Sequence, residues 1–118
     1  MTSFSRRIRP FVSRELAAAH RAHDYSTRFM HLERAHVLGQ ASTREHVRTH
    51  FHMLICAWRH GDAHEVAGQL LRLIGAAALT GIGMVPAGNT GGANVSPSQR
   101  MSIPPDLAIL IAGARRRR

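Results

Sequence analysis

Apolar residues recur at intervals of three and four along the first part of the chain, which is the spacing of one face of an α-helix. In residues 8–22, for instance, Ile8, Val12, Leu16 and Ala19 share one face. Short stretches that contain serine, aspartate or glycine interrupt the pattern, so it predicts separate helices rather than one long helix. The expected helices run from residue 8 to 22 or 23, from 25 or 26 to 39, from 43 to 60, and from 63 to about 80.

Two of these helices begin with residues that cap free amide groups. Residues 42–45 fit a capping box, in which the Ser42 hydroxyl accepts from the Glu45 amide and the Glu45 side chain returns a bond to the Ser42 amide. Asp62 is expected to cap the next helix. Gly39 and Gly61 are expected to end the helices that precede these caps.

Beyond residue 80 glycine and proline become frequent, and the helical pattern stops. Residues 81–104 are expected to form an irregular loop that lies against the helices through its apolar side chains. Residues 105–113 fit a short helix with proline in its first turn, and residues 114–118 form a basic tail. The expected fold is one all-α domain over residues 1–118. It contains two tandem antiparallel helical hairpins, arranged as a four-helix bundle or a tetratricopeptide-like pair.

A faint internal repeat supports the tandem hairpins. At an offset of 38 positions, Phe29, Leu32 and Ala35 align with Ala67, Leu70 and Leu73. The offset exceeds the tetratricopeptide period of roughly 34 residues, and the signature residues of that repeat are incomplete. The repeat therefore indicates architecture, and it leaves a tetratricopeptide-like protein-interaction module as the alternative function.

The charge of the chain argues against a nucleic-acid binder. The formal net charge is +9, and all 16 basic residues are arginine. Arg6, Arg7, Arg9 and residues 115–118 account for seven of them, which leaves nine arginines against seven acidic residues. The body of the chain is nearly neutral, and no recognition motif is present, so nucleic acid is the least favoured partner.

The chain carries no pattern of a secreted or membrane protein. Cys56 is the single cysteine, which excludes an intrachain disulfide and fits a reducing compartment. The arginines at positions 6, 7 and 9 are not followed by the apolar core of a secretory signal. The most apolar stretch, residues 73–85, is shorter than the roughly 20 residues that a membrane-spanning helix needs. The expected location is the cytoplasm.

The nine histidines carry most of the candidate chemistry. At about 100° per residue, each can be placed on its helix relative to the apolar face. His31 and His52 point away from that face. The histidines that point inward are His20, His23, His36, His46 and His50.

Two spacings among the inward histidines are typical of metal sites. Glu33 and His36 form a Glu-x-x-His unit, which helical bundles use for iron or manganese. His46 and His50 lie one turn apart and present two nitrogens to one ion. We therefore predict a site with His36, His46 and His50 as core ligands and Glu33 as the fourth, and with His20 and His23 opposite.

The identity of the ion stays open, since zinc, copper, nickel and iron all accept imidazole and carboxylate ligands. The alternative is that the same histidines are structural and are satisfied by hydrogen bonds within the core. The metallopeptidase pattern His-Glu-x-x-His is absent, and the residues indicate no substrate or reaction. A non-catalytic metal-binding protein is therefore favoured over an enzyme.

Three segments resemble a known family. Residues 32–40, 68–73 and 86–92, of sequence LERAHVLGQ, GQLLRL and PAGNTGG, are similar to an uncharacterised family of small bacterial proteins, catalogued as a domain of unknown function. The resemblance covers roughly residues 8–112. Some members are encoded near heavy-metal resistance genes, which implies a link to heavy-metal handling. Taken alone, the third segment predicts a loop in which Asn89 and the glycines adopt left-handed conformations to fold tightly onto the helices.

Overall fold

The computed structural model describes residues 2–80, 89–93 and 100–116, and this part of the chain is helical with no β-strand. The helices are α1 (Ser3–Arg21), α2 (Tyr25–Gly39), α3 (Thr43–His60), α4 (Ala63–Thr80) and α5 (Pro105–Arg115). The predicted all-α fold is confirmed. Among the described residues, no helix is both long enough and apolar enough to cross a membrane.

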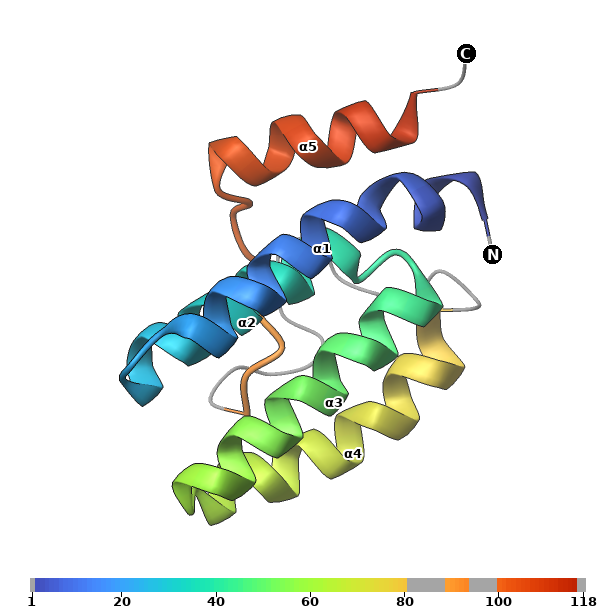
Figure 1. Ribbon diagram of the computed structural model, residues 1–118. Helices are drawn as coiled ribbons and strands as arrows, with labels where there is room; N and C mark the ends of the chain where they lie inside the picture. The colour runs from blue at the N-terminus through green and yellow to red at the C-terminus, as the bar shows by residue number, and fades with distance from the viewer. Residues whose placement is uncertain (1, 81–88, 94–99, 117–118) are drawn as a thin grey trace.

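The first four helices form two hairpins in sequence, as the periodicity predicted. Helix α1 packs on α2, α2 packs on α3, and α3 packs on α4. Figure 1 shows α5 lying across α1 on the side of the molecule away from the α3–α4 hairpin. Helix α3 also contacts α1, whereas α5 contacts only α1 and α2, so among the described helices α4 has α3 as its single neighbour.

The N-terminus of α3 is capped by only one of the two bonds expected of a capping box. The Ser42 hydroxyl accepts from the Glu45 amide at 3.3 Å, as predicted. The Ser42 amide, however, donates to the Gly39 carbonyl at 2.9 Å, and the Glu45 carboxylate accepts instead from Arg48 at 3.1 Å. The tight α2–α3 turn thus supplies the bond that the glutamate was expected to make.

The remaining helix boundaries agree with the pattern except at the start of α1 and at the end of α5, which continues to Arg115, two residues into the predicted basic tail. Asp62 caps α4, since its side chain accepts from the Glu65 amide at 3.0 Å, and Gly61 ends α3 with φ of 82°. Helix α1 begins at Ser3, capped by Thr2, rather than near residue 8. Pro10 therefore lies inside the helix rather than in its first turn.

The apolar core lies mainly within the first hairpin and α5. Helix α3 supplies one methionine to it, and none of the clustered core residues comes from the part of α4 whose side chains are described, residues 63–77. The core residues are Ile8, Val12, Leu16, Ala19, Phe29, Leu32, Ala35, Val37, Leu38, Met53, Leu107, Ile111 and Ala114. The space between α2, α3 and α4 is filled instead by buried polar side chains, which sets the second hairpin apart.

Candidate metal centre

Three imidazole rings meet between α2 and α3. The Nε2 atom of His36 lies 2.9 Å from that of His46 and 3.1 Å from that of His50. The third side of the triangle, between His46 and His50, measures 3.2 Å. All three residues are buried, with at most 6% of each exposed. Their ligand atoms form the one cluster of three or more metal-ligating groups found in the described part of the chain.

Local structure explains why these rings meet. His46 and His50 are one turn apart on α3, so both project from the same helix face. His36 lies in the last turn of α2, and the short turn over residues 40–42 brings α3 back alongside it. The inward orientation of these three histidines, predicted from the periodicity, is confirmed by their burial.

The outer nitrogens of two rings face oxygen atoms that can only accept a hydrogen bond. The Nδ1 atom of His36 lies 2.6 Å from the backbone carbonyl of Asn89. The Nδ1 atom of His50 lies 2.5 Å from Oε1 of Gln69. The Nε2 atom of Gln69 donates to the Glu65 carboxylate and to the Gly91 carbonyl. These two bonds fix the orientation of the Gln69 amide, so that its oxygen faces His50. Both Nδ1 atoms therefore carry a hydrogen.

This arrangement selects the tautomer of both rings. A neutral imidazole carries one N–H, so the Nε2 atoms of His36 and His50 are unprotonated acceptors. Their lone pairs face each other across 3.1 Å without a hydrogen of their own between them. The contact is repulsive unless a cation, or a hydrogen donated by His46 at 2.9 Å from His36 and 3.2 Å from His50, faces the two lone pairs. Histidines that bind a metal typically donate the hydrogen of their other ring nitrogen to a carbonyl or carboxylate oxygen in this way.

The surroundings keep all three rings neutral. Burial, with the nearby His50 and His46, holds the pKa of His36 well below its usual value. Burial also lowers the pKa of His46 to about 3, helped by His50, and that of His50 to about 4. Neutral imidazole is the form that binds a metal ion, because its lone pair is free.

A short described segment, residues 89–93, closes the site over His36. Gly91 has φ of 82°, and a Cβ atom there would lie 2.4 Å from the His36 ring. Only glycine fits, because both the conformation and the close approach exclude a side chain. The segment contains no non-glycine residue with positive φ, so the left-handed conformation predicted for Asn89 is wrong and that for Gly91 is confirmed. Residues 86–88 lie outside the described residues.

One face of α4 holds this segment in place. The Glu65 carboxylate accepts from the Ala93 amide at 2.8 Å, and Arg72 donates to the Gly91 carbonyl at 2.8 Å. Gln69, between them on the helix, bonds both the same carbonyl and His50. The buried face of α4 is therefore polar, and its side chains hold both the His50 ring and the segment that covers His36.

His20 and His23 do not take part, and their predicted inward orientation is wrong. His20 is exposed because it follows Ala19, the last buried residue of α1, by about 100° around the helix. His23 is exposed beyond the end of α1. Glu33 is half-buried, and its carboxylate lies outside the histidine cluster. Burial, with the negative charge of Glu65, raises the pKa of Glu33.

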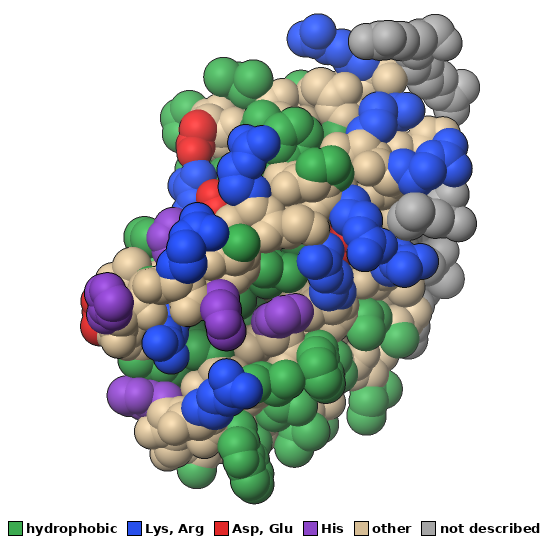
Figure 2. Space-filling model, viewed as in Figure 1, with side chains coloured by type: hydrophobic (Ala, Val, Ile, Leu, Met, Phe, Trp, Pro, Cys, Tyr) green, Lys and Arg blue, Asp and Glu red, His purple; other side chains and the backbone are tan. Residues whose placement is uncertain are grey.

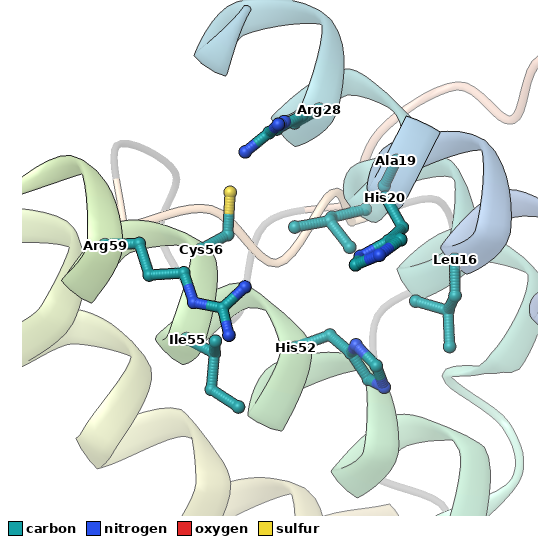
Figure 3. A pocket seen from close by; sticks show the side chains of 9 residues that line it. Leu16, Ala19, His20, Arg28, His52, Ile55, Cys56 and Arg59 are labelled. Atoms are coloured by element: carbon teal, nitrogen blue, oxygen red, sulfur yellow. The ribbon is translucent and has the colours of Figure 1, made fainter. Parts of the chain in front are cut away.

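His20 lines a different pocket, shown in Figure 3 with His52, Arg28, Arg59 and Cys56 around it. The pocket lies between α1, α2 and α3. Its imidazoles and thiol do not converge as the buried histidines do. Burial raises the pKa of the Cys56 thiol, which does not favour a reactive thiolate.

The sequence analysis did not identify the residues that support the histidines. They are Glu65, Gln69, Arg72, Asn89 and Gly91. Glu65, Gln69 and Arg72 do carry a detectable signal, since their spacing of four and three places them on one face of an otherwise apolar helix. Asn89 and Gly91 lie more than 50 residues from His36 in sequence, as the separation of 53 for the Asn89 contact shows. No local pattern links residues that far apart.

Comparison with known proteins agrees with the resemblance noted above. A family model described as "Protein of unknown function (DUF3703)" matches residues 6–111, and the chain belongs to this family. The match includes the three histidines and every residue that supports them. No curated protein and no solved structure has detectable similarity to the chain, so the tetratricopeptide-like arrangement stays a prediction.

Proposed function

We propose that this protein binds a transition-metal ion through the Nε2 atoms of His36, His46 and His50. One observation carries the proposal: two of these nitrogens are locked by Asn89 and Gln69 as lone-pair donors that face each other at 3.1 Å. A cation between the rings would turn this repulsive contact into a favourable one.

The spacing of the nitrogens suits a metal ion. Three imidazoles bound to one tetrahedral zinc at about 2.0–2.1 Å have their nitrogens about 3.3 Å apart. The observed separations of 2.9, 3.1 and 3.2 Å are a few tenths of an ångström shorter. The rings would have to move only slightly to reach the bound geometry. The folded protein therefore already holds the three nitrogens close to the positions that a metal ion requires.

The three imidazole ligands favour some metal ions over others but do not identify a single one. Three imidazoles suit zinc, copper, nickel and iron, whereas magnesium and calcium prefer oxygen ligands. The nearest carboxylate on the same helix is Glu33, one turn before His36, and we propose it as the fourth ligand. The link of the family to heavy-metal handling, implied by resemblance, is consistent with a binding or buffering role for such an ion.

A metal-free network is the competing explanation. If His46 carries its hydrogen on Nε2, it donates to His36 at 2.9 Å or to His50 at 3.2 Å, but one N–H cannot fully satisfy both. The two explanations differ in metal content and in the response to added metal.

The decisive experiment is metal analysis of the protein purified without a histidine tag. We expect close to one equivalent of a transition metal by mass spectrometry, and a raised melting temperature when zinc, copper, nickel or iron is added to the stripped protein. Binding at 100 times the dissociation constant stabilises the folded state by about 2.7 kcal/mol.

The matched variants are His50→Asn and the double variant His20→Asn with His23→Asn. The first removes a buried ligand, and the second removes two exposed histidines that lie outside the cluster. The proposal requires metal to be lost from the first and kept by the second. Metal-free protein with no thermal response to any of the four ions would refute it.

A further inference from the structure

A small pocket between α1, α2 and α3 is lined by basic side chains and lies outside the metal centre. Figure 2 shows arginine and histidine side chains along the boundary between the two hairpins, and few acidic side chains on this face. The basic residues that line the pocket are His20 from α1, Arg28 from α2, and His52 and Arg59 from α3. None of the nine lining residues is acidic.

One wall of the pocket is apolar. Leu16 and Leu32 line it and are only 6% and 3% exposed. Leu16 lies one turn before His20 on α1, and Leu32 lies one turn after Arg28 on α2. The basic groups therefore stand beside a wall of low dielectric constant, which strengthens their electric field within the pocket.

The two arginines of the pocket are not neutralised by a carboxylate. Arg28 donates through Nε to the Ala22 carbonyl at 2.7 Å, which fixes its side chain beside the end of α1. Within the described part of the chain, neither Arg28 nor Arg59 forms an ion pair, whereas Arg34 and Arg48 on the same two helices do. Two uncompensated positive charges at one pocket repel each other, and a bound anion would remove this repulsion.

Both arginines act on the same point of the pocket, the thiol of Cys56. Burial raises the pKa of Cys56, and the positive charges of Arg28 and Arg59 oppose this shift. Figure 3 shows the guanidinium groups of the two arginines and the thiol around one opening, with the rings of His20 and His52 on its other side. The charged groups are therefore directed into a shared space rather than spread over the surface.

We propose that this pocket binds a small tetrahedral oxyanion of the phosphate class, with Arg28 and Arg59 as the main ligands and the rings of His20 and His52 as further donors. The site is separate from the proposed metal centre and does not depend on it. The cavity measures about 80 Å³, far less than the roughly 300–1,000 Å³ of pockets that take drug-sized ligands. The ligand is therefore a group of a few atoms.

The directions of the donors favour a tetrahedral anion over a planar one. A carboxylate is typically bound in its plane by two parallel N–H groups of a single guanidinium. In this pocket the guanidinium groups come from two helices, α2 and α3, and a ring from α1 lies on another side (Figure 3). An anion whose oxygens point in several directions can accept hydrogen bonds from all three helices at once.

The test is calorimetric titration of the full chain with inorganic phosphate at neutral pH, with ionic strength matched by chloride. The protein is first passed over a chelating resin, so that no bound metal ion contributes. We expect saturable binding of one phosphate per chain, with competition by sulfate and none by acetate. Phenyl phosphate is titrated in parallel. Weaker binding than phosphate identifies the free ion as the ligand, and tighter binding identifies the phosphate group of a larger molecule.

Cys56 provides a second measurement, because it is the single cysteine and lines the pocket. Alkylation by iodoacetamide, a neutral reagent, reports on this thiol alone. Phosphate should slow the reaction severalfold, since a bound anion covers the thiol and disfavours the thiolate. Chloride at the same ionic strength should not slow it.

The variant Arg59→Gln should weaken phosphate binding by about tenfold or more, because a charged hydrogen-bond donor is lost. It should also abolish the protection of Cys56. Its matched control is Arg44→Gln, which removes an exposed arginine from the other end of α3 and should bind phosphate as the wild type does. Arg28→Gln should resemble Arg59→Gln, with circular dichroism to verify that it folds.

Three results would overturn the proposal. The first is the absence of both binding heat and protection of Cys56 at millimolar phosphate. The second is acetate binding as tight as that of phosphate, which would contradict the tetrahedral ligand. The third is an equal loss of affinity in Arg59→Gln and Arg44→Gln, because phosphate would then respond only to the net charge of the chain.

Discussion

The Nε2 atoms of His36 and His50 face each other at 3.1 Å while the Nδ1 atom of each ring donates to an oxygen. The oxygens come from the Asn89 backbone and from Gln69, so the segment after α4 and α4 itself determine which nitrogen of each ring is free. A metal centre is described incompletely by its ligands, because the groups behind the ligands set their tautomers. Substitutions of the residues that set these tautomers should therefore change metal binding, as substitutions of the ligands should.

Replacement of Gln69 by alanine should weaken metal binding without removing a ligand. The His50 ring would lose the acceptor that holds its hydrogen on Nδ1, and changes of this kind typically cost about 10–100-fold in metal affinity. Competition with a chromophoric chelator measures the change. Gln40→Ala, which removes another buried glutamine, is the control and should keep the wild-type affinity. Equal affinity for wild type and Gln69→Ala would contradict the proposed role.

Glu33→Gln tests the fourth ligand. The substitution keeps the shape of the side chain and removes its charge, so metal affinity should fall by about tenfold or more if the carboxylate binds the ion. The metal-free protein should not lose stability, because burial and Glu65 raise the pKa of Glu33 and already disfavour its charge. Unchanged affinity for zinc and copper would show that Glu33 is not a ligand.

The metal-free protein should lose stability as the pH falls below about 6.5. His36, His46 and His50 have lowered pKa values in the folded protein, so the unfolded chain binds more protons at mildly acidic pH. Each histidine then contributes a loss of up to about 1.4 kcal/mol per pH unit until its own folded-state pKa is reached. Above a pH of about 7 the three histidines are neutral in both the folded and the unfolded chain, so they should not change the free energy of unfolding.

Urea unfolding of the stripped protein at a series of pH values measures this dependence. The variant His50→Asn should have a shallower slope between pH of about 6.5 and 4.5, because one of the titrating groups is gone. A wild-type stability that is constant over this interval would mean that the three rings are not held neutral in the folded protein.

Gly91→Ala and Gly113→Ala should have opposite effects on stability. A Cβ atom at Gly91 would lie 2.4 Å from the His36 ring on a backbone with φ of 82°, so the substitution should destabilise the protein by about 1–3 kcal/mol. It should also weaken metal binding, since the His36 ring must move. At Gly113, inside α5, nothing lies within 4 Å of the new methyl group, and helix propensity predicts a gain of about 0.5–1 kcal/mol.

Thermal unfolding of both variants provides the comparison. The pair shares the same chemical change and differs only in surroundings, so it isolates the contribution of the close approach at Gly91. A Gly91→Ala protein with wild-type melting temperature and metal affinity would show that residues 89–93 do not close the site in solution.

The sequence by itself determined the helices and the inward side of the two that carry the ligands. Helical periodicity is local, so the spacing of His46 and His50 and the phase of His36 relative to Phe29 were enough to place these rings on buried faces. The same reasoning failed for His20, because one further residue beyond Ala19 turns the side chain out of the core by about 100°.

Only the tertiary structure decided which histidines lie together and which groups accept hydrogen bonds from their outer ring nitrogens. Asn89 and Gly91 reach His36 across 53 and 55 positions of sequence, and Gln69 reaches His50 from the next helix. Contacts of this range depend on how whole helices pack, which the local pattern of apolar residues does not specify. The same packing left large apolar residues of α4 exposed, where periodicity alone would have placed them in the core.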